Sequence, residues 1–406
     1  MEQNLGKGLS AKCVIIPGKL CNSDKPQDNY INKIVEMPLD DIHMKKILLN
    51  EILISKLIRK RTNDIKKSTE WLEDQFGIIE DVCPLKDFTE SIIKKCDIDT
   101  KLKENYFIYV IKNAGCRPIK TGSKVKLIDG TSGTITKYRG NNIKVEKDGI
   151  EKYVKIEDIM SGCGDFTTKS VLDIISSSNI KFIKSMFLKL LNSIKFLHSI
   201  NIVHCDIKHP NIIMDSDLNV RIVDFGSSIN LVDFTQQEFK DFCANLPLIY
   251  SSKKVNFFIK EAFRDISTTR KKLHIVESMQ TTLTEKIGAM TMMYVPPEIV
   301  IANHLSSPKE HILESVLEFC KLGSKHTKEI EELIKKKQEI INDLFCKKNP
   351  ELFKYDVYSL GMFFGYLVIS CKIKNKDLND IIEKMMTINY KKRPSIDECI
   401  NHKFFK

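Results

Sequence analysis

The sequence lacks the features that mark membrane and secreted proteins. Its longest nearly uncharged apolar run, residues 361–371, is too short to cross a bilayer, because a membrane-spanning helix takes about 20 residues. The first residues, from Met1, contain no basic segment followed by an apolar block, which a secretory signal needs. We therefore expect neither membrane insertion nor secretion.

Cysteine pairing motifs are also missing. The 12 cysteines stand singly between Cys13 and Cys399, with no CxxC pair and no Cys/His cluster at the spacing of zinc ligands. A cytosolic chain with reduced, mostly buried thiols is the simplest interpretation. The pattern assigns no metal or redox role to any cysteine.

Arginine is scarce, although the net charge is +11: only eight of the 64 Lys and Arg residues are Arg. Because bidentate contacts to bases favour Arg, this composition argues against a nucleic-acid reader. The lysines are interspersed with acidic residues, which indicates a solvated, mildly basic surface that can still favour acidic protein partners. The lysine bias also suggests an AT-rich genome.

The chain has enough apolar material for a sizeable core, with 42% hydrophobic residues in 406, and its length indicates two to three domains. The first 165 residues are rich in β-type runs, such as residues 30–35 and 106–111, with one helical pattern at 42–61. The later chain is dominated by helical patterns. They cover residues 180–199, 310–348, 356–371 and 377–386.

Residues 121–159 have a different texture. Four short β-type runs are separated by Asp129-Gly130, the segment 139–142 and Asp148-Gly149, and such pairs between strands are hairpin signals. A small antiparallel barrel or meander is expected here. The pattern resembles SH3-like small barrels, and an ordinary hairpin extension without a binding function is the alternative.

Two carboxylates and one amide stand close together in one stretch, residues 202–226. Asp206 and Asn211 lie five residues apart on a short loop, and Asp224 follows 18 residues after Asp206, with apolar runs between them that fit a hairpin. Phosphoryl transfer from a nucleotide needs such a set. One carboxylate orients the attacking hydroxyl, while hard oxygen ligands hold Mg²⁺ against the phosphates.

The same stretch resembles the catalytic loop and the metal-binding segment of eukaryotic-type protein kinases. Residues 204–211, His-Cys-Asp-Ile-Lys-His-Pro-Asn, stand for H-R-D-x-K-x-x-N, and Asp-Phe-Gly at 224–226 is unaltered. The resemblance covers nearly the whole chain apart from insertions. It implies an α+β, bilobal protein kinase-like fold, with a five-stranded β-rich N-lobe that carries one helix, and a helical C-lobe.

The resemblance implies a role for each of these side chains. Asp206 would be the catalytic base for the acceptor hydroxyl, and Lys208 would stabilise charge on the transferring phosphoryl group. Asn211 would complete the catalytic set and, together with Asp224, would hold the metal. The implied cofactors are ATP and Mg²⁺, bound in the cleft between the lobes.

Lys33 and Glu51 match the ATP-positioning ion pair of the family. Lys33 stands in a strand pattern and Glu51 in the helical pattern that follows, 18 residues later. Lys33 would contact the α- and β-phosphates, and Glu51 would hold its ammonium group in place.

Three further residues match the family's scaffold. Glu298 ends a segment, residues 291–298, that resembles the one ending in A-P-E, and it would pair with Arg393. Asp356 stands at the start of the expected large central helix and would cap backbone amides of the catalytic loop.

The glycine-rich nucleotide loop is the least well matched part. Residues 5–11 resemble L-G-x-G-x-x-G, with Gly6 and Gly8 in the first two glycine positions and Ala11 in the third. A second register aligns residues 14–21 with V-x-x-P-x-x-x-C, and Leu9 then falls on a glycine. In both registers Gly8 lies at or beside the phosphate turn. A Walker-type GxxxxGK[ST] motif is absent.

Two residues indicate the acceptor. Lys208, two residues after Asp206, is the pattern of Ser/Thr kinases, and Thr291, three residues before Tyr294, matches the threonine that hydrogen-bonds the catalytic loop in those enzymes. A Ser/Thr hydroxyl of a protein substrate is the expected acceptor.

Two substitutions depart from the family. Cys205 replaces the Arg that normally receives an activation-loop phosphate, which predicts activity without loop phosphorylation. Ser55, one turn after Glu51, stands where the family has a larger apolar residue of its hydrophobic spine. Looser coupling between this helix and the active site is therefore expected.

Three insertions complete the predicted organisation: residues 1–120 form the N-lobe, 121–160 the small SH3-like β insertion, and 161–406 the C-lobe, with insertions near 232–285 and 302–353. The last contains a charged amphipathic helix around 326–345. The insertions and the lysine bias resemble kinases of giant cytoplasmic DNA viruses. A cytoplasmic location is expected, in the host cytoplasm or the virion if the protein is viral.

Two other functions stay open. A pseudokinase scaffold would recruit partners through the insertions, and the degenerate glycine turn favours it, whereas the complete Lys/Glu/Asp/Asn/Asp set argues against it. A small-molecule or lipid kinase is disfavoured by residues 291–298, which in the family shape a peptide-binding ledge. The pattern gives neither the protein substrates nor the oligomeric state.

Overall fold

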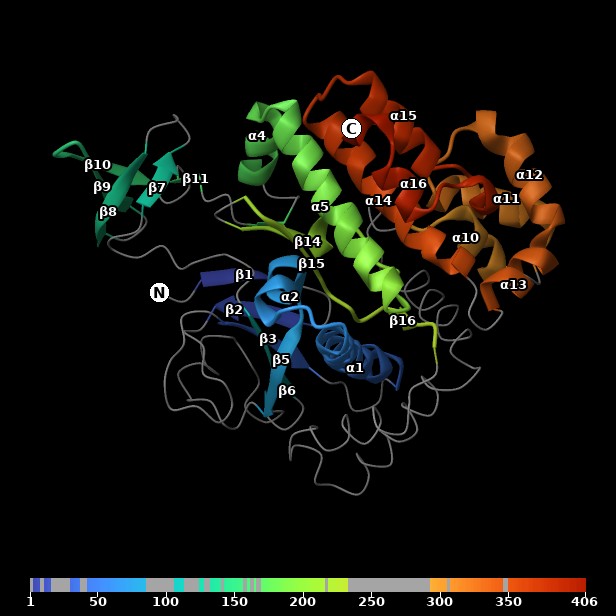
Figure 1. Ribbon diagram of the computed structural model, residues 1–406, viewed down its shortest axis with the longest axis horizontal. Helices are drawn as coiled ribbons and strands as arrows, with labels where there is room; N and C mark the ends of the chain where they lie inside the picture. Colours follow the sequence, from blue (N-terminus) through green and yellow to red (C-terminus); the bar gives the residue numbers. More distant parts are fainter. Residues whose placement is uncertain are drawn as a thin grey trace.

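The protein is described by a computed structural model of the 406-residue chain (Figure 1). The described residues are 3–7, 11–15, 30–36, 42–84, 106–112, 124–127, 132–139, 142–155, 159–160, 164–165, 169–215, 218–232, 293–304, 307–345 and 350–406.

The first part of the chain forms a five-stranded antiparallel sheet in the order β1-β2-β3-β6-β5. Its strands are β1 (Gln3–Lys7), β2 (Ala11–Ile15), β3 (Tyr30–Glu36), β5 (Ile79–Pro84) and β6 (Tyr106–Lys112). Five strands agree with the sequence-based prediction. Two helices follow β3 instead of the expected one: α1 (Ile42–Asp64) and the short α2 (Thr69–Gln75), which begins at the N-cap Ser68.

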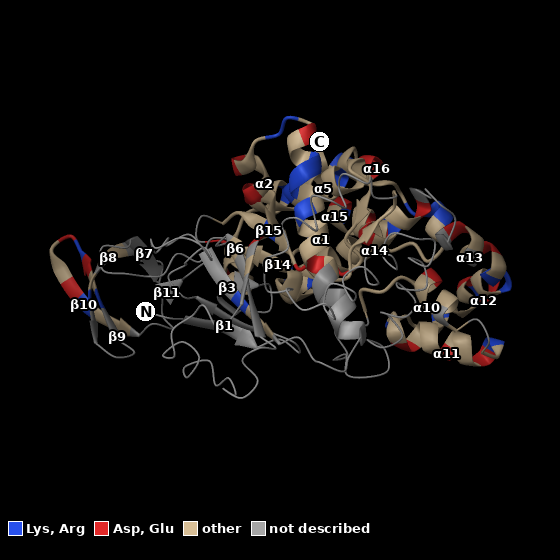
Figure 2. Ribbon diagram, turned by 90° about the horizontal axis from the view of Figure 1, so that it is seen from below, with Lys and Arg blue, Asp and Glu red and all other residues tan. Residues whose placement is uncertain are grey.

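A second five-stranded sheet lies apart from the first, at one end of the molecule (Figures 1 and 2). Its strands run in the order β10-β9-β8-β7-β11: β7 (Lys124–Leu127), β8 (Ser132–Arg139), β9 (Asn142–Lys147), β10 (Ile150–Lys155) and β11 (Ile159–Met160). Asp148 and Gly149 join β9 to β10 with positive φ values of 52° and 80°, as a type I′ hairpin turn requires. The predicted hairpin at Asp-Gly is therefore present.

The remaining described chain is mostly helical. Its helices are α4 (Lys169–Ser177), α5 (Ile180–Ser199), α10 (Pro297–Asn303), α11 (Lys309–Phe319), α12 (Thr327–Lys335), α13 (Lys337–Phe345), α14 (Phe353–Ser370), α15 (Lys376–Met385) and α16 (Ile396–Ile400). Helix α5 begins at Asn179, whose side chain accepts the main-chain N–H of Phe182. Its apolar side is buried, and Phe187 stacks on Phe364 of α14 with the ring centroids 3.7 Å apart.

Short strands connect the helical part to the first. The strands β12 (Gly164–Asp165), β14 (Ile212–Met214), β15 (Val220–Val223) and β4 (Phe76–Gly77) form one sheet, and β13 (Ile202–Val203) pairs with β16 (Ile229–Asn230). Because β4 directly follows α2 and pairs with β15, the α1–α2 segment is attached to the strand that leads to Asp224.

One hydrophobic core extends across both parts of the molecule. It contains Ile54, Leu57 and Ile58 of α1 and Leu72 of α2, together with the buried sides of α5, α14 and α15. Helix α1 is therefore packed against the helical part as well as against its own sheet.

The range of the insertion predicted near 302–353 contains the helices α11, α12 and α13, at the end of the molecule opposite the small sheet (Figures 1 and 2). The single helix expected over 326–345 is wrong: it breaks at Lys336, where φ is −97° and ψ is 18°. With this break, Ile330 and Ile334 before it and Ile340 after it all face a second core, shared with α10. The insertion expected near 232–285 lies outside the described residues, apart from Val232.

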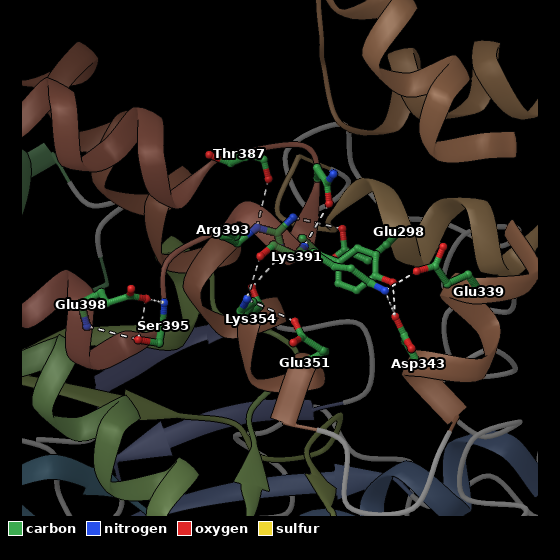
Figure 3. A network of polar contacts seen from close by, with 12 residues as sticks. Glu298, Glu339, Asp343, Glu351, Lys354, Thr387, Lys391, Arg393, Ser395 and Glu398 are labelled. Carbon is green, nitrogen blue, oxygen red and sulfur yellow. Dashed lines mark hydrogen bonds and ion pairs between the residues drawn. The ribbon is translucent and has the colours of Figure 1, made fainter. Parts of the chain in front are cut away.

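A polar network attaches α13 to the C-terminal segment (Figure 3). The Tyr390 hydroxyl donates to Asp343 Oδ2 of α13 at 2.6 Å, and the Lys391 ammonium pairs with Asp343 at 2.8 Å and with Glu339. Hydrogen bonds to Asp343 and Glu339 raise the pKa of Lys391 to about 12. Helix α13 is thus held by charged contacts as well as by the second core, which it shares with α10.

Candidate active site

Lys33 of β3 and Glu51 of α1 form a bidentate contact. Lys33 Nζ donates to Glu51 Oε1 at 2.9 Å and to Oε2 at 3.0 Å, and Glu51 is 4% exposed. Burial raises the pKa of Glu51 above its ordinary 4.5, and the Lys33 charge opposes that shift. The two side chains that the sequence paired are therefore in contact.

The loop between β13 and Asn211 brings three predicted residues together. Lys208 Nζ lies 2.9 Å from Asp206 Oδ2, and Asn211 Nδ2 donates to the same Oδ2 at 2.8 Å and to the main-chain oxygen of Asp206 at 2.9 Å. Burial alone would lower the pKa of Lys208, but the Asp206 carboxylate outweighs burial and raises it. Lys208 therefore stays protonated.

Asp356, fully buried near the start of α14, accepts hydrogen bonds from the main chain of this loop. Its Oδ2 accepts the main-chain N–H of His204 at 2.8 Å, its Oδ1 accepts that of Cys205 at 2.9 Å, and Oδ2 also lies 3.0 Å from His198 Nε2. The predicted capping of the catalytic-loop amides by Asp356 is confirmed. Cys205 adopts a left-handed φ of 61°, which these bonds help to maintain.

His204 links the loop to the strand before Asp224. Its Nε2 lies 3.2 Å from the Val223 oxygen, and its Nδ1 lies 3.3 Å from the main-chain nitrogen of Asp206. The two contacts fit one neutral tautomer, in which Nε2–H donates to Val223 and Nδ1 accepts from Asp206.

Asp224 follows β15 in the left-handed conformation, with a φ of 66°. Burial alone would raise the pKa of its carboxyl. The charges of Lys33 and Lys208 and the hydrogen bond from Gly226 N at 3.3 Å outweigh burial and lower it. Lys33, Glu51, Asp206, Lys208 and Asp224 form one charged group, because the charge of each residue shifts the pKa of another member or its own pKa is shifted by the charge of one.

Two side chains of this group suit a hard divalent cation. Both hydrogen bonds of Asn211 use its amide nitrogen, so its carbonyl oxygen points the other way and is the atom left to ligate a metal. The lowered pKa keeps Asp224 ionised. An amide oxygen and a carboxylate are ligands that Mg²⁺ accepts, so the residues present fit the expected metal.

The glycine loop is only partly described. Gly6 lies in β1, where the pairing with β2 shifts register between Asn4 and Gly6. Gly8 lies outside the described residues, and so does Thr291. The two registers of this loop and the contact expected for Thr291 therefore stay predictions.

The predicted scaffold pair is confirmed. Arg393 donates to Glu298 from Nη1 at 2.8 Å and from Nη2 at 3.0 Å, and both residues are buried (Figure 3). The guanidinium also donates to the main-chain oxygens of Thr387 and Lys354, so four of its five N–H groups have partners.

Two contacts near the site escaped the sequence analysis. His209 Nδ1 lies 2.7 Å from the hydroxyl of Tyr294, which joins the catalytic loop to the segment before Glu298. Asn50, beside Glu51, donates to main-chain oxygens after Asp224. Neither residue type carries a signal that identifies its partner, because both partners are more than 80 positions away in the sequence.

Comparison with known proteins matches the same region. Residues 152–247 fit the family model of the protein kinase domain. This segment is similar to protein kinases. A serine/threonine-protein kinase of Schizosaccharomyces pombe, ppk8, is 49% identical over 43 residues, which are 11% of this chain and 8% of that protein.

Two further relatives have related names. The dual specificity protein kinase zak2 of Dictyostelium discoideum is 32% identical over 128 residues, 30% of this chain and 18% of that protein. The phosphorylase b kinase gamma catalytic chain, liver/testis isoform, of Homo sapiens is 44% identical over 48 residues, 12% of each chain. The matches thus span less than a fifth of these relatives, and together with the family model they support a protein serine/threonine kinase.

None of the described helices combines the length and the apolar character that a membrane span needs.

Proposed function

We propose that this protein is an ATP-dependent serine/threonine protein kinase that transfers the γ-phosphoryl group to Ser/Thr hydroxyls of protein substrates. The observation that carries the proposal is the contact of Lys208 and Asn211 with the same carboxylate oxygen of Asp206. A loop that holds one carboxylate, one ammonium and one amide together contains the polar groups that phosphoryl transfer needs.

In this proposal Asp206 orients the acceptor hydroxyl and accepts its proton. Oδ2 is taken by Lys208 and Asn211, whereas Oδ1 accepts no hydrogen bond from the described part of the chain. Oδ1 is therefore the oxygen available to the hydroxyl. Lys208, kept protonated, lies beside it and would stabilise negative charge on the transferring group.

Lys33 would contact the α- and β-phosphates of ATP, with its ammonium held by Glu51, while Gly6 and Gly8 would belong to the loop over the phosphates. Asn211 and Asp224 would hold Mg²⁺ through the amide oxygen and the ionised carboxylate. The metal, when bound, neutralises charge that develops on the phosphates. The depressed pKa of Asp224 supports this role, because a protonated carboxyl would not ligate the metal.

The test is transfer of labelled phosphate to casein or a basic protein by the full-length chain with ATP and Mg²⁺. We expect Asp206→Asn and Lys33→Met each to lower the turnover number at least about 100-fold while the chain stays folded. Lys335→Met, an exposed residue of α12, is the control and should leave turnover unchanged. Near-wild-type turnover in Asp206→Asn would contradict the mechanism.

The pseudokinase alternative is not favoured, because the groups expected of an active enzyme are present and in contact. Thermal shift with ATP and Mg²⁺, followed by the transfer assay, separates the two functions. Nucleotide binding without transfer would identify the scaffold.

The finer features belong to the same proposal. The segment 121–160 would be an SH3-like insertion, and the likeness to kinases of giant cytoplasmic DNA viruses rests on the insertions and the lysine bias. We place the protein in the cytoplasm, where it would act on protein substrates without reading nucleic acid. Activity would not require loop phosphorylation, since the Cys205 thiol is buried where the family has an Arg.

A further inference from the structure

Asn50 connects helix α1 to the segment that follows Asp224. It is buried directly before Glu51, and its Nδ2 donates to the main-chain oxygens of Gly226 and Ser228, each at 2.8 Å. Both amide hydrogens are thus used, and each satisfies a carbonyl group more than 170 positions away. Arg61 of the same helix contacts the chain further on, where its Nη1 donates to Asn230 Oδ1 at 2.8 Å.

The segment that Asn50 contacts holds a strained conformation. Asp224 has a φ of 66°, which costs an L-residue free energy unless its surroundings maintain it. Several hydrogen bonds do so: Gly226 N donates to Asp224 Oδ1 at 3.3 Å, Ser228 N to the Phe225 oxygen at 3.1 Å, and Ser228 Oγ to the His204 oxygen at 3.1 Å. The two bonds from Asn50 tie Gly226 and Ser228 directly to α1.

These contacts close a ring around the charged group. Lys33 Nζ donates to Glu51, the preceding residue Asn50 donates to the Gly226 oxygen, and the Gly226 N–H donates to the Asp224 carboxylate. Lys33 in turn lowers the pKa of Asp224 through its charge. One helix therefore contacts both Lys33, through Glu51, and the segment that carries Asp224, through Asn50.

Ser55 is a second buried polar residue of α1, close to Asn50 in the sequence. It is buried one turn after Glu51, and its hydroxyl has no hydrogen-bond partner among the described residues. Looser coupling of α1 to the active site was expected from Ser55. The polar contacts of Asn50 supply coupling at a different point of the helix.

We infer that Asn50 is a positioning residue, which holds the Asp224 segment in its metal-binding conformation relative to the Lys33–Glu51 pair. This inference rests on the proposed function. Without the two amide donors, the carbonyls of Gly226 and Ser228 lose their partners, and Asp224 samples other conformations. The enzyme then needs more Mg²⁺ to reach the same active population.

The test compares three full-length variants. Asn50→Asp keeps the shape of the side chain and has no donor while its carboxyl group is ionised. Asn50→Ser keeps one hydroxyl donor, and Ser55→Ala changes another buried residue of the same helix, whose hydroxyl has no hydrogen-bond partner among the described residues. For each we measure the turnover number, the KM for casein, the Mg²⁺ concentration that gives half-maximal activity, and amide hydrogen exchange at residues 224–228.

We expect Asn50→Asp to lower the turnover number about tenfold or more and to raise the half-maximal Mg²⁺ concentration severalfold, with the KM for casein unchanged. Asn50→Ser should lie between it and the wild type, and Ser55→Ala should match the wild type. A merely structural role of Asn50 would lower the amount of folded enzyme without moving the Mg²⁺ requirement. Wild-type turnover and Mg²⁺ requirement in Asn50→Asp would overturn the inference. If Asn50→Asp fails to fold, the same comparison on Asn50→Ser decides.

Hydrogen exchange separates this inference from the proposed function. If the wild-type chain transfers no phosphate, the proposed function fails, and faster exchange at 224–228 in Asn50→Asp would then show a structural contact alone. If the wild-type chain is active and exchange at 224–228 is unchanged in Asn50→Asp, the inference fails while the proposed function stands.

Discussion

Asp356 and the Glu298–Arg393 pair are buried charges with several hydrogen-bond partners each. Asp356 accepts two main-chain N–H groups of the loop that holds Asp206, and Arg393 binds both oxygens of Glu298 while two further N–H groups donate to main-chain oxygens. A buried charge is tolerated only with such compensation, and removal of one partner leaves the other uncompensated. At the scale of the residue, replacement of one member of such a pair should therefore destabilise the fold strongly.

Arg393→Met should lower the free energy of unfolding by about 3–5 kcal/mol, because it leaves the Glu298 carboxylate buried without its partner. Urea unfolding followed by circular dichroism measures the change. The matched control is Lys335→Met, which breaks a pair with Glu332 in which both side chains are more than 60% exposed, and it should cost less than about 1 kcal/mol. Similar losses in the two variants would contradict this account.

Glu51 should set the acid limit of activity. Its pKa is raised above 4.5 by burial, whereas the pKa of Asp224 is lowered below 3.8, so Glu51 takes up a proton first as the pH falls. Protonation breaks the ion pair with Lys33 and lowers activity, although it relieves the cost of a buried charge and so favours the fold. We expect the acid limb of the kcat/KM profile to have its midpoint above pH 4.5.

Glu51→Gln is the corresponding variant. It should show a low activity whose acid limb has moved to lower pH, because the titrating group is gone. An acid limb at the same midpoint in wild type and Glu51→Gln would assign the limb to another residue.

At the scale of the element, the packing of α14 on α15 depends on one glycine. A Cβ atom added to Gly361 would lie 2.8 Å from the Met385 Cβ and 3.2 Å from the Met386 Cγ. Four residues later, a Cβ atom on Gly365 would meet its nearest neighbour, the Ile382 Cγ2, at an ordinary 3.6 Å. The two glycines share one helix and one partner helix but differ in available space.

Alanine at the two positions should therefore act in opposite directions. Gly361→Ala should destabilise by about 1–3 kcal/mol, since the added methyl group forces the helices apart. Gly365→Ala should stabilise by up to about 1 kcal/mol, since alanine has the higher helix propensity and fits without strain. Thermal unfolding of both variants measures the difference, and a stabilised Gly361→Ala variant would refute the close approach of the helices.

At the scale of the whole molecule, the shared core joins helices from both parts of the chain, whereas the described strands of the small sheet pair only with one another. The core that contains α1 and α2 continues into α5, α14 and α15, so the two lobes that the sequence separates are packed as one body. The strands β7–β11 pair with one another and lie apart from that core (Figure 1).

Replacement of residues 121–160 by a Gly/Ser linker should leave phosphate transfer to casein within about twofold of the wild type, because none of the described residues of the small sheet belongs to the shared core. The transfer assay and thermal unfolding on the shortened chain test this prediction. The matched comparison is removal of 307–345, which contributes Ile312, Ile330 and Ile340 to the second core and should destabilise the chain strongly. Loss of folding on removal of the small sheet would contradict its independence.

Local features of the fold could be read from the sequence. The Asp148-Gly149 turn, the amphipathic face of α5 and the strands β3 and β6 follow from patterns that repeat over a few residues, because side-chain periodicity and turn chemistry act at that range. The number of five strands was predicted from the resemblance to protein kinases. The chemical groups of the candidate site, from Lys33 to Asp224, were also evident, since spacing and residue type survive in the linear chain.

Tertiary structure decided which atoms meet. The bonds from Asn50 to Gly226 and Ser228, and that between His209 and Tyr294, have no local pattern, because an amide or an imidazole can pair with many partners and its own type does not select one. The break at Lys336 likewise follows from packing against α10 and not from helical propensity. The sequence by itself determined which chemical groups the protein carries. Only the folded chain decided the conformation of the Asp224 segment, since Asn50 contacts main-chain carbonyl groups there, and the positions of these groups depend on the backbone and not on side-chain type.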